Sequence, residues 1–218
     1  MTSSNNDLPQ QATSDEAATP AAAAVRKRPP PGERRKQILE TLARMLEKPG
    51  SERITTAALA AELAVSEAAL YRHFASKAQM FEGLIDFIEQ SIFYLINQIG
   101  EREADPQARA SRILAMLLQF AEKNPGMARV MVGDALVLEH ERLQQRINLM
   151  LDKVESSLRQ HLRQVAEARA SATPSVDAQV RSSVMLAFAV GRMQRYVRTE
   201  FRRLPTEHLD ACLQQMLH

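Results

Sequence analysis

Few of the residues that build disulfides, aromatic platforms or phosphate loops occur in this sequence. Among 218 residues there are one cysteine, no tryptophan, three tyrosines and seven glycines. The single cysteine, Cys212, excludes an intramolecular disulfide and indicates a reducing, cytoplasmic setting. The scarcity of aromatic rings disfavours stacking on single-stranded nucleic acid, and the scattered glycines form no phosphate-cradling loop.

Long apolar runs are also absent, so the sequence predicts no membrane span. The first residues lack the basic start and apolar core of a secretory signal. The five histidines show no pairing four residues apart and no neighbouring cysteine, so we expect no metal site. The acidic residues accompany lysine and arginine in the manner of solvated helix faces. We therefore expect no enzyme and no bound cofactor.

Basic residues gather near the start of the chain. The formal net charge is only +2, yet six lysines and arginines fall between positions 26 and 36. Local positive potential of this kind holds a protein on phosphate. Residues 1–31 are rich in Ser, Thr, Asn, Ala and Pro, so we expect a disordered extension. The basic cluster at its end has two interpretations, a DNA-contacting arm or a solubilising tail.

The most informative stretch is 53–81, which predicts two short helices joined by a tight turn. Thr55 and Thr56 are helix-start residues, because a threonine hydroxyl accepts from free backbone N–H groups of the first turn. Ser66 is a second such start, and Glu67 suits the first turn electrostatically. The second helix has an apolar side and a polar, partly basic side, which is typical of a helix-turn-helix unit. The alternative is an ordinary helical hairpin whose polar side meets water.

The flanks favour the helix-turn-helix interpretation. An amphipathic helix predicted over 33–48 precedes the hairpin and could cover it. After the hairpin, Ser76 is expected to cap a long helix, and Lys77 then stands where phosphate would meet a helix N-terminus. We expect a DNA-binding head over residues 32–80 and a helical body over residues 81–218.

The run Leu-Tyr-Arg-His-Phe-Ala-Ser-Lys that ends at Lys77 resembles the signature of the TetR family of bacterial DNA-binding proteins. The resemblance implies an all-α fold in which a three-helix head reads the major groove and a helical bundle dimerises. It assigns DNA contacts to Arg34, Arg35, Thr55, Thr56, Ser66, Glu67, Ala68, Tyr71, Arg72, His73 and Lys77.

The body is predicted to be a set of amphipathic helices. The first runs over 76–100, with a buried stripe of Phe81, Leu84, Ile88, Ile92, Leu95 and Ile99. Phe87 and Tyr94 lie off this stripe, and packing against a neighbouring helix is the simpler expectation for them. An exposed phenylalanine there would instead mark a partner site.

Turn and cap signals divide the remainder. Asp105 and Pro106 predict a helix start, and the Asn124-Pro125-Gly126 stop predicts its end. A short helix to Val132, a long heptad-patterned helix ending near 170, a helix over 176–201 and a last one from 206 follow. The last helix has an apolar face that we expect to lie in the dimer interface, as the closing helices do in the family.

A narrower resemblance, to the nucleoid occlusion factors of this family, extends from about Arg34 to the end. It is carried by Arg-Ile-Thr-Thr-Ala, Lys-Asn-Pro-Gly and Val-Arg-Thr-Glu-Phe. It implies that the DNA-bound homodimer, with several dimers possible on one DNA site, binds the division GTPase FtsZ and disrupts its polymers. The residues assigned to FtsZ are Phe87, Leu95, Met116, Gln119, Lys123 and Asn124.

A second function remains open, that of a repressor released from DNA by a small molecule. Such a protein needs a pocket with convergent polar groups in its body. Gln119, Arg192 and Gln194 are the residues that could line one. The central helices carry mainly aliphatic side chains, which favours the nucleoid-associated inhibitor.

Overall fold

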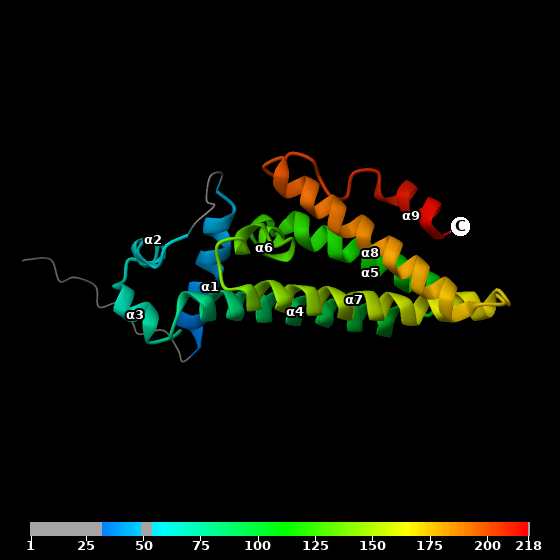
Figure 1. Ribbon diagram of the computed structural model, residues 1–218, viewed down its shortest axis with the longest axis horizontal. Helices are drawn as coiled ribbons and strands as arrows, with labels where there is room; N and C mark the ends of the chain where they lie inside the picture. The colour runs from blue at the N-terminus through cyan, green and yellow to red at the C-terminus, as the bar shows by residue number, and fades with distance from the viewer. Residues whose placement is uncertain (1–31, 49–53, 218) are drawn as a thin grey trace, which may run out of the picture.

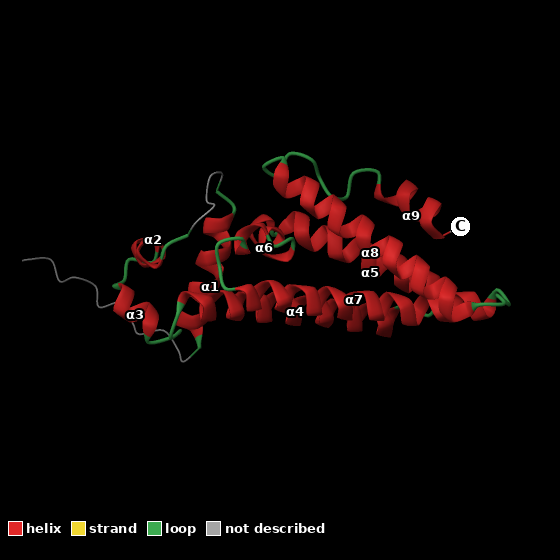
Figure 2. Ribbon diagram, in the orientation of Figure 1, coloured by secondary structure: helices red, strands yellow, loops and turns green. Residues whose placement is uncertain are grey.

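The computed structural model describes residues 32–48 and 54–217, and within these ranges it contains helices and no strand (Figure 2). This confirms the predicted all-α fold. The predicted extension, 1–31, lies outside the described residues. The elements are α1 (Glu33–Leu46), α2 (Thr56–Glu62), α3 (Glu67–Tyr71), α4 (Lys77–Arg102), α5 (Pro106–Lys123), α6 (Pro125–Met131), the 3-10 helix η1 (Asp134–Leu136), α7 (Glu141–Ala168), α8 (Pro174–Arg198) and α9 (Leu209–Leu217).

Helices α2 and α3 lie at one end of the molecule, with α1 between them and the body (Figure 1). Both begin at the predicted hydroxyl caps. The Thr55 hydroxyl accepts from the Ala58 N–H at 3.1 Å, and the Ser66 hydroxyl accepts from the Ala69 N–H at 3.3 Å. These bonds satisfy backbone donors that a first turn leaves free. The head's core consists of Ile38, Leu42, Leu46, Leu59, Leu70 and Phe74.

Helix α4 starts in the predicted head and continues into the body, so the expected boundary between residues 80 and 81 falls inside one helix. Its predicted stripe was right as far as Ile92 and wrong at Leu95, whereas Ile99 packs against the core as a partly buried residue. Ile96 is buried, whereas Leu95 and Ile99 are only half-buried. Three- and four-residue steps both suit a helix, and an apolar residue stands at either position. Packing selects Ile96, which leaves Leu95 at the surface.

The body is built on long helices that lie along one another (Figure 1). α7 packs against α4, α5 and α8. Its side toward α4 also carries four ion pairs: Arg142–Glu82 at 2.8 Å, Arg146–Asp86 at 2.5 Å, Arg146–Glu89 at 3.6 Å and Lys153–Glu89 at 2.6 Å. None of the described helices is long and apolar enough to cross a bilayer.

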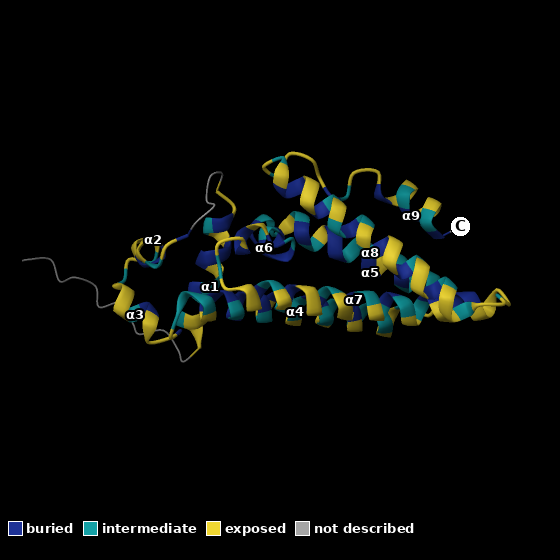
Figure 3. Ribbon diagram, viewed as in Figure 1, coloured by how far each residue is buried: buried dark blue, intermediate teal, exposed yellow. Residues whose placement is uncertain are grey.

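Much of the apolar face of α9 is covered within its own subunit, and the expectation that this face meets a second chain stays a prediction. Leu209, Leu213 and Leu217 are buried, and the helix packs on α5 and α8. Helix α8 has exposed positions along its length (Figure 3), and three of them are valines. Val176, Val180 and Val184, each one helical turn from the next, are more than half exposed. A short last helix can close the core of its own subunit, and the sequence pattern does not reveal which partner covers it.

Candidate nucleic-acid interface and partner groove

Helix α3 presents the side chains expected to reach DNA. Leu70 and Phe74 hold it against the core, each only 1% exposed. Tyr71 is 45% exposed, and its neighbours on the free side are exposed as well. Those neighbours are Glu67, Ala68, Arg72 and His73. A short helix with buried anchors and a free polar side has the form of a recognition helix, whose side chains meet base edges in the major groove.

The turn between α2 and α3 is held by local contacts. Ala64 has φ 51°, a left-handed conformation that favours glycine. Across the turn, the Thr56 hydroxyl donates to a Glu67 carboxylate oxygen at 2.6 Å. Thr56 and Glu67 therefore fix the angle between the helices, and the Thr55 and Ser66 hydroxyls are engaged as caps. These predicted DNA contacts shape the hairpin in the protein without DNA.

The two arginines of α1 that were assigned to DNA lie in different settings. Arg34 donates to the Gln37 side chain at 3.2 Å, one turn along the same helix. Arg35 braces α3: its guanidinium donates to the backbone oxygen of His73 at 3.1 Å and lies 4.1 Å from the centre of the Phe74 ring. A cation over an aromatic face adds to the stability of the head. Arg35 thus has a structural partner that its sequence position did not reveal.

Lys77, the first residue of α4, was expected to face phosphate. In the structure its ammonium forms an ion pair with Glu139, on the loop before α7. The side chains are 26% and 13% exposed. Sequence reasoning missed this partner, because the two residues are 62 positions apart.

A groove of about 410 Å³ lies between α4 and α5. It brings together three of the residues assigned to a protein partner, Leu95, Met116 and Gln119. Tyr94 also lines it and is 63% exposed, so the expectation that Tyr94 packs against a neighbouring helix was wrong. Two cations complete the lining, Arg102 and Arg112, which the sequence did not single out.

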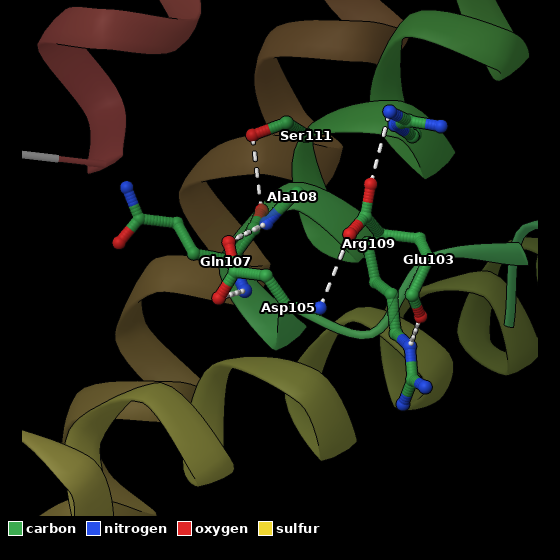
Figure 4. Close-up of polar contacts among 7 residues, drawn as sticks. Glu103, Asp105, Gln107, Ala108, Arg109 and Ser111 are labelled. Carbon is green, nitrogen blue, oxygen red and sulfur yellow. Dashed lines mark hydrogen bonds and ion pairs between the residues drawn. The ribbon is translucent and has the colours of Figure 1, made fainter.

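The α4–α5 turn at one end of this groove is cross-linked by polar contacts (Figure 4). The Asp105 carboxylate accepts from the Ala108 N–H at 2.9 Å, with Pro106 at the first helical position, which confirms the predicted start. The Glu103 carboxylate binds Arg112 at 2.9 Å and accepts from the Asp105 N–H at 3.1 Å. Glu103 therefore holds Arg112 beside the groove.

The other three predicted partner residues lie outside this groove. Phe87, 38% exposed, lines a separate apolar cavity of about 230 Å³ between α1 and α4. Lys123 is exposed at the last position of α5. The Asn124 side chain donates to the backbone oxygen of Phe120 at 2.8 Å and so serves the helix end. The six assigned residues form one contiguous groove only in part.

The residues considered for a small-molecule pocket do not converge. Arg192 donates to the backbone oxygens of Pro205 and Glu207, which anchors the loop before α9. Gln194 is exposed, and Gln119 lies in the open α4–α5 groove. Within the described ranges, His161 Nδ1 is the one buried side-chain nitrogen or oxygen without a hydrogen-bond partner. The described residues also hold no cluster of three metal-ligating side chains.

Known proteins share this architecture. Residues 38–84 match the family model of bacterial regulatory proteins of the tetR family, and residues 105–218 match that of the tetracyclin repressor-like, C-terminal domain of SlmA-like type. A TetR-family transcriptional regulator from Bordetella parapertussis superposes with a TM-score of 0.67 at 18% identity, over 85% of this chain and 95% of that one. The fold and the recognition helix define a TetR-type DNA-binding regulator.

Sequence relatives narrow the class further. The nucleoid occlusion factor SlmA of Idiomarina loihiensis is 50% identical over 183 residues, which are 84% of this chain and 93% of that protein. The SlmA of Shewanella sediminis is 51% identical over 177 residues, 81% of this chain and 89% of that protein. The chain belongs to the SlmA family of nucleoid occlusion factors.

Proposed function

We propose that the protein is a cytoplasmic, nucleoid-associated homodimer that binds chromosomal DNA, engages FtsZ while bound and prevents Z-ring assembly over the nucleoid. The observation that carries the DNA part is α3, a capped helix with two buried anchors and an exposed side headed by Tyr71. In this proposal residues 32–80 read DNA, and residues 81–218 dimerise and bind the partner. Residues 1–31 form the extension that precedes them.

DNA contacts divide by chemistry. Side chains of α3 from Ser66 to Tyr71 read base edges, which carry sequence information. The cations Arg34, Arg35, Arg72 and Lys77, with the Thr55 hydroxyl, contact phosphates, which position the protein. The Thr56 hydroxyl can join them only by releasing the Glu67 carboxylate, to which it donates in the absence of DNA. The second group makes affinity fall as salt rises, because each neutralised phosphate releases counterions.

FtsZ docks in the α4–α5 groove in this proposal. The groove offers an apolar floor, with Leu95 and Met116, beside two guanidinium groups, Arg102 and Arg112. Such a surface suits a peptide segment that carries apolar anchors and acidic residues. Tyr94 adds an exposed ring that a partner would bury. Phe87, Lys123 and Asn124 would extend the contact toward the head.

The homodimer is proposed to form through α8. The stripe Val176, Val180, Val184 continues through Ala187 and Gly191, which are exposed and small. A Cβ added to Gly191 would meet no atom within 4 Å, so this part of the subunit surface is open. Valines followed by small residues let a second α8 approach closely and exclude water from the apolar stripe.

A small-molecule-responsive repressor has less support, because the candidate pocket residues do not converge. The experiment that separates the two functions is sedimentation of FtsZ polymers formed with GTP. The protein is added alone and then with the duplex it selects from a random-sequence library. We expect less polymer in the pellet with the protein, and less again with the duplex. An unchanged amount of pelleted FtsZ at saturating protein and duplex would contradict the proposal and favour the small-molecule-responsive repressor.

A further inference from the structure

The segment from the start of η1 to the start of α7, residues 134–140, connects the DNA-binding head to the body at two points. At one end, Glu139 pairs with Lys77, the first residue of α4. At the other end, Asp134 pairs with Arg129 at 2.6 Å, and Arg129 also donates to the backbone oxygen of Leu46 at 3.3 Å. Leu46 is the last residue of α1. This segment is thus tied, through Arg129, to the end of the first head helix and, through Glu139, to the start of the helix that leaves the head.

The ion pair at Glu139 is well shielded from water. The side chain of Glu139 is 13% exposed and that of Lys77 is 26% exposed. The Lys77 ammonium also lies 5.7 Å from the centre of the Phe81 ring. An ion pair that is partly withdrawn from solvent is weakly screened by salt, so its loss is felt more than that of a surface pair.

The Lys77 ammonium is also placed to pair with a DNA phosphate. It stands at the start of α4, six positions after the last residue of the α3 recognition helix, where the head would meet DNA phosphate. Its ammonium cannot give full charge neutralisation both to the Glu139 carboxylate and to a phosphate. A carboxylate held beside the ammonium would also repel an approaching phosphate.

We propose that Glu139 is an affinity-determining residue for DNA, which competes with phosphate for Lys77. Binding of DNA breaks the Lys77–Glu139 pair and releases this end of the loop from α4. The proposal rests on the DNA-binding function proposed above and adds a residue of the body to it. The released segment includes Val137 and Leu138, which are already 78% and 67% exposed, so DNA binding alters a surface outside the head.

Fluorescence anisotropy with the selected duplex tests the proposal through a double-mutant cycle of the full chain. We expect Glu139→Gln to tighten DNA binding roughly threefold or more, because Lys77 is freed. Lys77→Gln should weaken binding and lower the slope of log affinity against log salt by about one. In the Lys77→Gln protein, Glu139→Gln should leave the DNA affinity unchanged, because the Glu139 carboxylate then has no ammonium at position 77 to pair with.

Glu141→Gln is the matched control. Glu141 is exposed, begins α7 two positions away and carries the same charge. If Glu141→Gln tightens binding as much as Glu139→Gln does, the effect is one of net charge and the proposal fails. It also fails if Glu139→Gln leaves affinity unchanged, or if the gain persists without Lys77. Absence of DNA binding by the unaltered protein would instead overturn the proposed function.

Hydrogen exchange gives a second readout that a general loss of stability would not reproduce. We expect exchange over 136–140 to rise when the duplex is added to the unaltered protein. In Glu139→Gln the same amides should exchange quickly without DNA, while amides in the core of α7 stay protected. Faster exchange throughout the body would show a structural role for Glu139 and would contradict the proposed competition for Lys77.

Discussion

Gly126 lies directly against the backbone of Ala43, so that a Cβ on Gly126 would stand 1.9 Å from the Ala43 carbonyl oxygen. Gly126 belongs to α6 and Ala43 to α1. The contact lets a body helix pack on a head helix without an intervening side chain. The obstacle to any larger residue is backbone, which cannot turn aside as a long side chain can.

We expect Gly126→Ala to lower the free energy of unfolding by about 1–3 kcal/mol, because the methyl group forces α6 away from α1. Gly100→Ala is the control. Gly100 lies in α4, and a Cβ there would meet no atom within 4 Å. That change should stabilise the helix by up to about 1 kcal/mol. Urea unfolding measures both, and equal effects would show that the α1–α6 contact is looser than the structure has it.

The turn of the helix-turn-helix carries a conformational cost that one substitution should relieve. Ala64 has φ 51°, which costs an alanine about 1 kcal/mol relative to glycine. We expect Ala64→Gly to raise the free energy of unfolding by up to about 1 kcal/mol, after the greater freedom of glycine in the unfolded chain is subtracted. Ala61→Gly, on an exposed position of α2, should lower it by a similar amount. Destabilisation by both changes would contradict the left-handed turn.

Local chemistry predicted much of this fold. Thr55, Ser66 and Asp105 cap their helices as expected, because a capping side chain needs only the backbone that follows it. The exposed side of α3 was likewise predictable from the sequence, because the buried residues opposite it recur at helical spacing.

Contacts between distant segments were not predictable. The partner of Lys77 and the cation over Phe74 depend on how helices pack, and no local pattern encodes that. The same limit explains why Leu95 was placed in the core and Tyr94 against a neighbouring helix. Arg102 and Arg112 entered the groove only once α4 and α5 were placed side by side.

Two exposed tyrosines allow DNA binding and partner binding to be separated. Tyr71→Ala should weaken binding to the selected duplex about fivefold or more, as loss of a base-edge contact costs about 1–3 kcal/mol. Its effect on FtsZ without DNA should be small. Tyr94→Ala should show the reverse, normal DNA affinity and less loss of pelleted FtsZ. Fluorescence anisotropy measures DNA binding, and sedimentation measures the effect on FtsZ. A Tyr71→Ala protein with full DNA affinity would contradict the placement of α3 in the major groove of DNA.

His161 is expected to make stability depend on pH. Burial lowers the pKa of its imidazole below the ordinary value, and the positive charge of Arg109 lowers that pKa further. The folded state therefore holds a neutral imidazole at a pH at which the unfolded chain already takes up a proton. Its contribution is intact above the unfolded pKa of about 6.5 and is lost as the pH falls through the folded value.

Urea midpoints at pH 7.5 and pH 5.5 test this. We expect the drop in midpoint on acidification to be smaller in His161→Gln than in the unaltered protein. His208→Gln serves as the control, because the side chain of His208 is 82% exposed and should leave the drop unchanged. An equal drop in all three proteins would show that the buried Nδ1 of His161 is hydrated or otherwise satisfied.

The valine stripe of α8 predicts where the homodimer can be broken. Val180→Asp places a carboxylate in the middle of the proposed interface, where burial without a partner is costly. We expect the protein to sediment as a folded monomer and to bind the selected duplex more weakly, since one head replaces two. Val137→Asp alters a more exposed valine away from α8 and should leave the dimer intact. Sedimentation equilibrium distinguishes the outcomes. A Val180→Asp dimer as stable as that of the unaltered protein would contradict a dimer interface on α8.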